Sequence, residues 1–191
     1  TWLAPLVNQY YQGIAQCNDI DQAFTMLAKF RVLCVTRQGE FGVDALNQWI
    51  KELIIHRYNR SQTSYHGMPI MISENDYRLG LFNGDIGLLW RTEGDHLMAF
   101  FENSDQIDTH EKAQENTEDN SKGESYKILL PSRLPKYEAV YAMTIHKTQG
   151  SEFEHVAIVL PKTAEHQLLS RELLYTGITR AKDSLTIASN K

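Results

Sequence analysis

The chain has 191 residues, a length that suits one compact domain or a domain that carries an insertion. Hydrophobic residues make up 42% and charged residues 23% of it, so the composition excludes a wholly disordered chain, a collagen-like fibre and a low-complexity protein. No apolar run approaches the roughly 20 residues that cross a bilayer, and no basic start precedes an apolar stretch near the N-terminus. We therefore expect a cytoplasmic protein that does not contact membranes.

The chain has two cysteines, Cys17 and Cys34, which are too few for a disulfide-stabilised scaffold. Their separation also excludes a Cys-x-x-Cys motif for zinc or redox chemistry. We expect both to be buried thiols, and we expect no metal site.

The net charge of −5 is concentrated in one segment. Eight acidic residues and only two basic ones lie between Glu102 and Glu124, so the rest of the chain is close to neutral. The segment has only Ile107 as a sizeable apolar side chain and cannot bury enough surface to offset the entropy of ordering. We predict a mobile acidic loop over residues 103–124, either a tolerated surface insertion or an acidic tail that binds a partner.

The N-terminal third has the pattern of helices followed by a strand–helix unit. Apolar residues at helical spacing predict two short helices within residues 1–30, with Asn18 or Asp19 capping the second. Arg31–Thr36 is a short apolar run rich in β-branched residues, typical of a strand covered on both faces. A loop with two glycines follows, and helical spacing then returns from Val43 to Ile54. Residues 1–30 are thus a helical lead-in to a parallel-sheet βα unit.

The middle of the chain, residues 67–136, has a different pattern. Short strand-like runs are separated by turn sequences such as Asn83-Gly84-Asp85, and no helical period is present. Several short strands at regular spacing predict a small antiparallel β-barrel. The runs are 69–72, 86–90, 96–101 and 126–130.

After Pro135 the pattern of alternating strands and helices returns. We predict strands over 139–145, 156–160 and 185–188 and a helix that begins near Ser170. The predicted fold is therefore α/β. Its parallel-sheet domain is built from residues 31–66 and 137–191, and the barrel of residues 67–136 interrupts it.

Two segments carry more polar side chains than a core requires. The first, Thr144–Phe153, follows a predicted strand, and ligands of open α/β sheets bind beyond the carboxyl ends of strands. Its hydroxyl and imidazole groups suit phosphate oxygens or a nucleobase, and its carboxylate suits ribose hydroxyls. The second, Leu173–Lys182, would by itself indicate an amphipathic helix whose basic side chains reach water.

Together, in this order, the two segments resemble motifs V and VI of superfamily 1 DNA helicases, and in particular the RecD family, the alpha chains of exonuclease V. Residues 81–87, residues 131–135 and the strand–loop–helix of residues 33–47 also resemble this family. The resemblance implies a RecA-like second motor domain with an inserted barrel similar to a Src-homology-3 fold.

The resemblance also implies roles for individual residues. Thr144 and His146 would contact single-stranded DNA, while Gly150 and Glu152 would lie on the nucleotide side of motif V. Arg180 would be the catalytic arginine that reaches the γ-phosphate. The intact protein would use ATP with Mg²⁺, bound mainly by a first motor domain, and would associate with RecB- and RecC-type subunits. Its activity would be DNA unwinding in recombination and repair.

A phosphate-binding loop of the Walker type is absent from the 191 residues. Such a loop needs Gly-Lys followed by Ser or Thr, and none of the 11 glycines precedes a lysine. An Asp-Glu pair at the end of a strand, which could hold Mg²⁺, is not identifiable either. We therefore predict that this chain alone does not hydrolyse ATP.

Two other functions remain open at this stage. One is a non-catalytic nucleic-acid-binding module that stacks bases on Trp90, Phe100 and Phe101, although such aromatics are commonly barrel core. The other is a hydrolase with His146 as base and Ser151 as nucleophile, which lacks an identified orienting acid.

Overall fold

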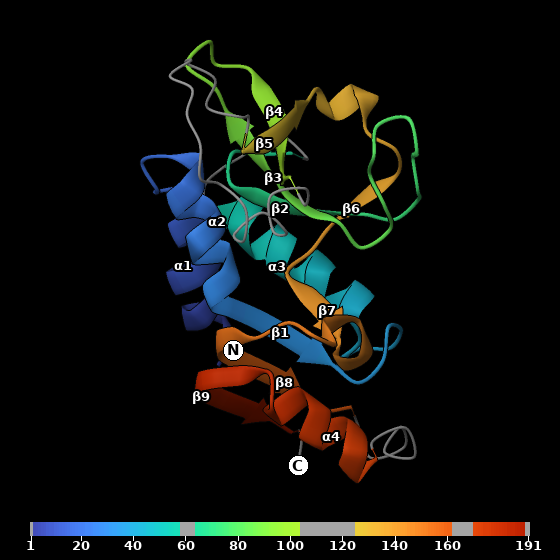
Figure 1. Cartoon of the computed structure of the whole chain (residues 1–191). Helices are drawn as coiled ribbons and strands as arrows, with labels where there is room; N and C mark the ends of the chain where they lie inside the picture. The colour runs from blue at the N-terminus through green and yellow to red at the C-terminus, as the bar shows by residue number, and fades with distance from the viewer. Residues whose placement is uncertain (1, 58–63, 104–124, 162–169, 190–191) are drawn as a thin grey trace, which may run out of the picture.

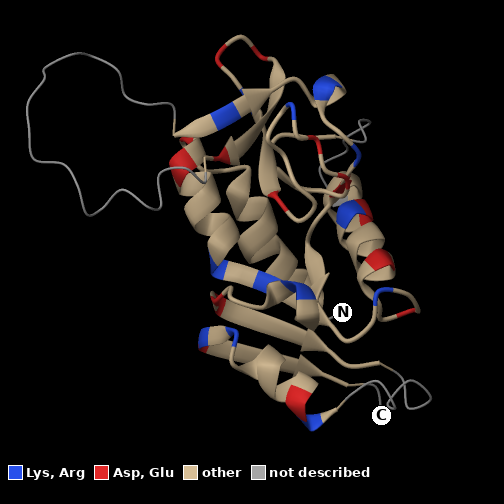
Figure 2. Ribbon diagram, turned by 45° about the vertical axis from the view of Figure 1, so that its right-hand side comes forward, with Lys and Arg blue, Asp and Glu red and all other residues tan. Residues whose placement is uncertain are grey.

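The computed structural model describes residues 2–57, 64–103, 125–161 and 170–189. Two sheets organise these residues (Figure 1): a four-stranded parallel sheet in the order β7-β1-β8-β9 and a five-stranded antiparallel sheet in the order β5-β4-β3-β2-β6. Residues 104–124, nearly all of the predicted acidic loop, lie outside the described residues. Basic and acidic residues are interspersed over the described ribbon in the view of Figure 2.

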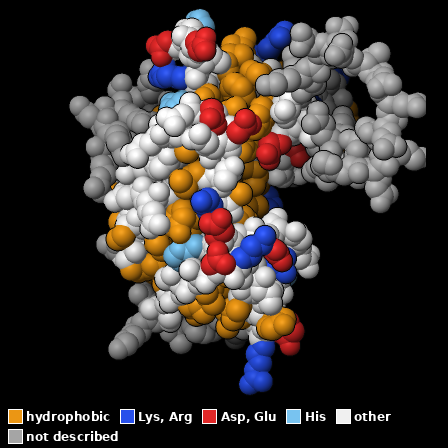
Figure 3. Space-filling model, turned by 60° about the vertical axis from the view of Figure 1, so that its left-hand side comes forward, with side chains coloured by type: hydrophobic (Ala, Val, Ile, Leu, Met, Phe, Trp, Pro, Cys, Tyr) orange, Lys and Arg blue, Asp and Glu red, His pale blue; other side chains and the backbone are white. Residues whose placement is uncertain are grey.

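The two N-terminal helices are present as predicted. They are α1 (Leu3–Ile14) and α2 (Ile20–Lys29). Of the two candidate caps, Asp19 begins α2, because its carboxylate accepts a hydrogen bond of 2.8 Å from the backbone N–H of Gln22. Figure 3 shows the side of the molecule on which these helices lie, where apolar side chains are visible between charged and polar ones.

Strand β1 (Phe30–Cys34) lies in the interior of the parallel sheet. It pairs with β7 (Ala142–Thr144) on one side and with β8 (Phe153–Val159) on the other, and β9 (Ala181–Ala188) pairs with β8. All five residues of β1 are buried, so the prediction of a strand covered on both faces is confirmed.

Alternate residues of β1 pack on opposite faces of the sheet. Val32 and Cys34 belong to the core shared with α1 and α3 (Val43–Arg57). Leu33 belongs to a second core with Leu173 of α4 (Arg171–Ile178). The parallel sheet is therefore the middle of three layers, an α/β arrangement (Figure 1).

The four strand-like runs of the middle region form strands. Together with β6 they make an antiparallel sheet, and no pairing joins its outer strands β5 and β6 within the described residues. The described sheet is therefore open at this point. Its strands are β2 (Met68–Ile72), β3 (Ile86–Arg91), β4 (Leu97–Glu102), β5 (Tyr126–Leu129) and β6 (Tyr137–Ala139), and the short 3₁₀ helix η2 (Pro131–Arg133) precedes β6.

The predicted single strand over residues 139–145 is wrong, because the chain passes from one sheet to the other within it. Strand β6 belongs to the antiparallel sheet and β7 to the parallel one, and Val140 and Tyr141 between them are fully buried. The N–H of Val140 donates to Pro69 of β2 (3.1 Å), and the carbonyl of Tyr141 accepts from Val32 of β1 (3.4 Å). The antiparallel sheet thus extends past residue 136, where we placed its end.

Both cysteines are free thiols, but only Cys34 is buried. Burial raises the pKa of the Cys34 thiol to about 12, so the group is neutral and unreactive at physiological pH. Cys17 is half-buried, which corrects the prediction for this residue. None of the helices in the described part of the chain is long and apolar enough to cross a membrane.

Candidate functional site

The first polar segment, Thr144–Phe153, runs from the carboxyl ends of the parallel strands back to their amino ends. Strand β7 ends at Thr144, the 3₁₀ helix η3 (Ile145–Thr148) follows, and β8 begins at Phe153. Thr148 is buried and its hydroxyl donates to the carbonyl of Ile145 (2.7 Å), which closes η3 on itself. The side chain of His146 is exposed.

The predicted site residues of this segment lie at opposite edges of the sheet. Thr144 pairs with Cys34 at the carboxyl end of β1, whereas Phe153 pairs with Ala181 at the amino end of β9. All four strands run in parallel. Thr144 and the adjoining η3 therefore lie where the strands end, here called the carboxyl edge, and the residues just before Phe153 lie where the strands begin, here called the amino edge. The structure does not bring the two predicted DNA-binding residues together with the predicted nucleotide-binding residues.

The second polar segment begins with a capped helix. The hydroxyl of Ser170 accepts from the N–H of Leu173 (3.1 Å) at the start of α4, as the prediction of a helix beginning there requires. Hydrogen bonds to the backbone and to Ser170 hold the pKa of the exposed Glu172 carboxyl below its usual value. Arg180 follows the C-terminus of α4, where the helix dipole favours a cation.

Arg180 joins the two segments. Its guanidinium donates to the carbonyl of Ser151 through Nη1 (3.2 Å), to the carbonyl of Thr176 through Nε (3.1 Å) and to the hydroxyl of Thr179 through Nη2 (3.3 Å). The backbone carbonyl of Arg180 in turn accepts from the N–H of Phe153 (2.8 Å). Residues of the two predicted motifs therefore form one hydrogen-bonded cluster at the amino edge of the sheet.

The rest of this cluster is charged and open to solvent. Lys182 forms an ion pair with Glu152 at 3.3 Å, and both side chains are 57% exposed, so the pair contributes at most about 1 kcal/mol. Gly150 has a φ of +84°, and apart from its chain neighbours no described residue has an atom within 4 Å of where its Cβ would be. The space beside Gly150 and the donors of Arg180 suit an anion such as a phosphate.

Arg31 is a buried cation close to the start of β8. Its Nη1 donates to the carbonyl of Val140 (3.2 Å), and its guanidinium lies 5.3 Å from the ring centre of Phe153. Its Nε has no hydrogen-bond partner, and burial lowers the pKa of the group. Arg31 thus connects the β6–β7 crossing to the end of the first polar segment, a role that its position in an apolar run did not indicate.

Gly177 allows α4 to lie against η3. A Cβ at this buried position would lie 3.1 Å from the Cδ1 atoms of Ile145 and Ile158. We expect Gly177→Val to lower the free energy of unfolding by about 1–3 kcal/mol, because overpacking pushes α4 from the sheet. Urea unfolding monitored by circular dichroism checks this.

The matched control is Gly13→Ala in α1, where a Cβ would meet only the side chain of Met26 at 3.7 Å. This variant should raise stability by about 0.5–1 kcal/mol through helix propensity. If Gly177→Val is as stable as the wild type, α4 is not closely packed on η3.

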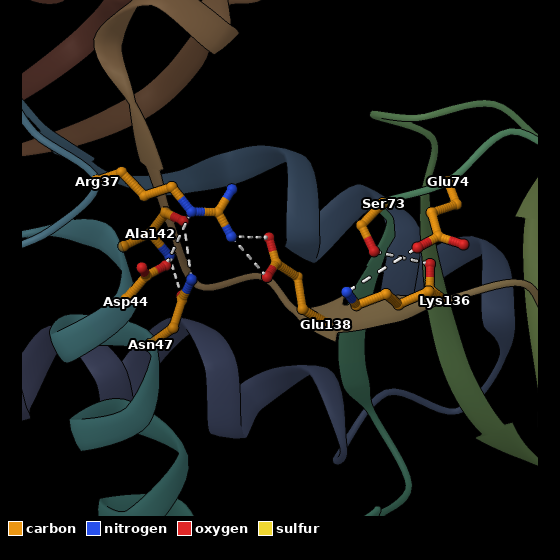
Figure 4. A network of polar contacts seen from close by, with 8 residues as sticks. All are labelled: Arg37, Asp44, Asn47, Ser73, Glu74, Lys136, Glu138 and Ala142. Carbon is orange, nitrogen blue, oxygen red and sulfur yellow. Dashed lines mark hydrogen bonds and ion pairs between the residues drawn. The ribbon is translucent and has the colours of Figure 1, made fainter.

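A polar network connects the loop after β1 to the β6–β7 crossing (Figure 4). Arg37 binds Asp44 through Nε (3.2 Å) and Glu138 of β6 through Nη2 (3.0 Å). Asn47 of α3 accepts from the N–H groups of Tyr141 (2.8 Å) and Ala142 (2.7 Å) and donates to the carbonyl of Ala142 (3.3 Å). Arg37 and Asn47 were part of the sequence resemblance, but nothing in the sequence indicated these partners.

An apolar groove of about 770 Å³ lies where β8 and β9 end, and none of the predicted site residues lines it. No local pattern in the sequence indicates this groove, because its walls come from four separate parts of the chain. Large side chains that line it are Trp2, Phe41, Leu46, Trp49, Leu160 and Ile187.

The residues on which the two alternative functions depend are not arranged for those functions. Trp90, Phe100 and Phe101 are 8%, 7% and 3% exposed and belong to the core, so they cannot stack on bases. No hydrogen bond joins the described side chains of His146 and Ser151, as a base and nucleophile require. The described residues also hold no cluster of three or more His, Cys, Asp or Glu side chains that could bind a metal ion.

Comparison with known proteins identifies relatives of the chain. A family model described as the UvrD-like helicase C-terminal domain matches residues 139–188. The RecD subunit of the RecBCD enzyme from Haemophilus influenzae is 35% identical over 184 residues, which are 94% of this chain and 24% of that subunit. The ATP-dependent RecD2 DNA helicase from Deinococcus radiodurans is 29% identical over 161 residues, or 80% of this chain and 19% of that helicase.

The crystal structure of Pif1 helicase from Bacteroides in complex with ADP-AlF3 and single-stranded DNA has a TM-score of 0.46 and 15% identity, covering 97% of this chain and 49% of that one. The chain spans about a quarter of the length of the RecD subunits that it matches. The similarity to RecD subunits over nearly the whole chain, with the match to a helicase C-terminal domain, confirms the predicted resemblance.

Proposed function

We propose that this chain, which is similar to RecD subunits over nearly its whole length, is the second motor part of an ATP-dependent DNA helicase that acts in recombination and repair. In the intact complex its partners would be single-stranded DNA and RecB- and RecC-type subunits. The observation that carries the proposal is the bond between the guanidinium of Arg180 and the carbonyl of Ser151, which unites the two helicase-like segments in one cluster.

On the nucleotide side, Gly150, Glu152 and Arg180 would face bound ATP. The open backbone at Gly150 and the donors of Arg180 fit a phosphate group. As the resemblance implies, Mg²⁺ would be held mainly by a first motor domain. ATP supplies the phosphoanhydride bond whose hydrolysis drives movement. The guanidinium of Arg180 would donate hydrogen bonds to the γ-phosphoryl oxygens, on which negative charge develops.

On the DNA side, Thr144 and the exposed imidazole of His146 would donate to phosphate oxygens or pack against a base at the carboxyl edge of the sheet. The segment from His146 to Glu152 would then couple the two sites, since it crosses from one edge to the other. The close approach of Gly177 in α4 to Ile145, the residue just before this segment, supports a coupled movement of the segment and Arg180.

The parallel sheet would be RecA-like, and the antiparallel sheet would be the family's inserted barrel, similar to a Src-homology-3 fold. Its five antiparallel strands support this assignment, and no pairing joins β5 to β6 among the described residues.

His146→Ala tests the DNA-binding side. In the native polypeptide that contains these residues, we expect this variant to bind fluorescein-labelled oligothymidylate about tenfold more weakly, through loss of one charge-assisted contact. Fluorescence anisotropy at fixed salt concentration measures the effect. ATP affinity should stay within about twofold.

The matched control is His96→Ala, which removes an exposed histidine in the turn between β3 and β4. Its DNA affinity should equal that of the wild type. Loss of ATP affinity with normal DNA affinity in His146→Ala would contradict the assignment of His146.

A further inference from the structure

The loop between β2 and β3, residues 73–85, places two aromatic side chains in solvent. Tyr77 is 79% exposed and Phe82 is 45% exposed. Their ring centres lie 5.8 Å apart with planes at 74°, so Phe82 supports the Tyr77 ring by an edge-to-face contact. This cluster, Tyr77 with Phe82, is distinct from the buried aromatics of the same sheet.

The backbone that carries Tyr77 is fixed by local hydrogen bonds. The Asp76 carboxylate accepts from the N–H groups of Arg78 (2.9 Å) and Leu79 (3.1 Å). The backbone groups of Asp76 and Leu81 also bond to each other in both directions, at 2.7 and 3.0 Å. Tyr77 therefore lies in a small closed turn.

The backbone around Phe82 is fixed as well. The Asp85 carboxylate accepts from the N–H of Phe82 (2.8 Å). From β5, the Lys127 ammonium donates to the carbonyls of Leu79 (2.7 Å) and Gly80 (2.9 Å). A loop held in this way presents its exposed rings with little entropy left to lose on binding.

We propose that Tyr77, supported by Phe82, stacks on a base of single-stranded nucleic acid, and that Arg78 contacts the adjoining phosphate. The proposal rests on the proposed function and adds a DNA contact outside Thr144 and His146. Every base offers a ring face, so aromatic side chains beside a cation are a common means of binding single strands. The Arg78 side chain is 94% exposed and its ion pair with Asp76 is long (3.9 Å), so its guanidinium is available to a phosphate.

The position of the loop is consistent with a shared DNA path. Ser73 donates to the carbonyl of Lys136 through both its N–H (2.8 Å) and its hydroxyl (2.9 Å), and Lys136 forms an ion pair with Glu74 at 3.9 Å (Figure 4). Lys136 precedes β6, from which the chain continues to Thr144. In Figure 1 the loop lies on the right of the view, the same side as η3.

The test compares Tyr77→Ala, Tyr77→Leu and Tyr77→Trp in the native polypeptide. The probes are fluorescein-labelled oligothymidylate and an abasic oligonucleotide of equal length. We expect Tyr77→Ala and Tyr77→Leu to bind oligothymidylate about five- to 150-fold more weakly, the range that base–aromatic stacking spans. Tyr77→Trp should bind as the wild type does, and all four proteins should bind the abasic probe equally.

Ile128→Ala, at an apolar side chain of β5 that is 48% exposed, is the matched control and should bind both probes normally. Equal loss on both probes, or no loss for Tyr77→Ala, overturns the proposal, and the second result would leave the loop as a surface for a protein partner. If His146→Ala binds oligothymidylate weakly and Tyr77→Ala binds it as the wild type does, only the loop proposal fails. If the wild type does not bind oligothymidylate, the proposed function fails with it.

Discussion

Replacing Arg180 by alanine in the native polypeptide is expected to reduce DNA-stimulated ATP hydrolysis by about 10³- to 10⁵-fold, the range measured for arginines that act on a transferred phosphoryl group. ATP affinity should fall much less. A guanidinium interacts more strongly with the charge that develops on the γ-phosphoryl oxygens in the transition state than with the ground state. Steady-state turnover and the binding of a fluorescent ATP analogue measure the two effects separately.

A purely structural role for Arg180 makes a different prediction. The guanidinium donates to Ser151, Thr176 and Thr179, and it lies at the C-terminus of α4. Loss of these contacts at a partly exposed site should lower the free energy of unfolding by about 1 kcal/mol, which leaves the protein folded. Thermal unfolding of Arg180→Ala therefore shows whether a loss of turnover comes from a loss of structure.

Two further variants sharpen this experiment. Arg180→Lys keeps the positive charge but not the planar set of donors, so it should recover only part of the turnover. Lys182→Ala removes a neighbouring cation from the same edge of the sheet and should keep most of it. Near-normal turnover in Arg180→Ala would contradict the assignment, and so would equal losses in Arg180→Ala and Lys182→Ala.

The elements that could be predicted from the sequence are those whose pattern is local. The apolar run at β1 and the helical spacing before and after it reflect burial that each segment shows by itself. The two sheets could not be separated at residues 139–145, because Val140 and Tyr141 are apolar and buried like the strand residues on either side. Only their partners, Pro69 and Val32, show where the chain leaves one sheet for the other.

The residue types of the candidate site could be predicted from the sequence, but their arrangement in space could not. The polar segments at Thr144–Phe153 and Leu173–Lys182 were evident, yet the contact between Arg180 and Ser151 depends on β8 and β9 starting at the same edge. The sequence also gave no means of telling exposed Tyr77 from buried Phe100. Exposure is a property of the folded sheet, not of the aromatic residue.

Asn47→Leu is expected to lower the free energy of unfolding by about 3 kcal/mol. Among the described residues strand β7 pairs with β1 alone, so its other side would be an open lateral edge of the parallel sheet. The Asn47 amide closes this edge, since it binds both the N–H and the carbonyl of Ala142 and the N–H of Tyr141. Leucine has a similar volume but leaves these three backbone groups without their partner, and each buried unpaired group costs about 1–3 kcal/mol.

Asn47→Asp is the matched control for this variant. A carboxylate oxygen still accepts from the N–H groups of Tyr141 and Ala142, but the donor to the carbonyl of Ala142 is lost. Its stability should therefore lie between those of the wild type and Asn47→Leu in urea unfolding. Gln48→Leu, at the neighbouring position, removes only a hydrogen bond to Glu52 on the exposed side of α3 and should change stability by less than about 0.5 kcal/mol. If Asn47→Leu is as stable as Gln48→Leu, water satisfies the edge of β7, and α3 does not hold the strand that leads to Thr144.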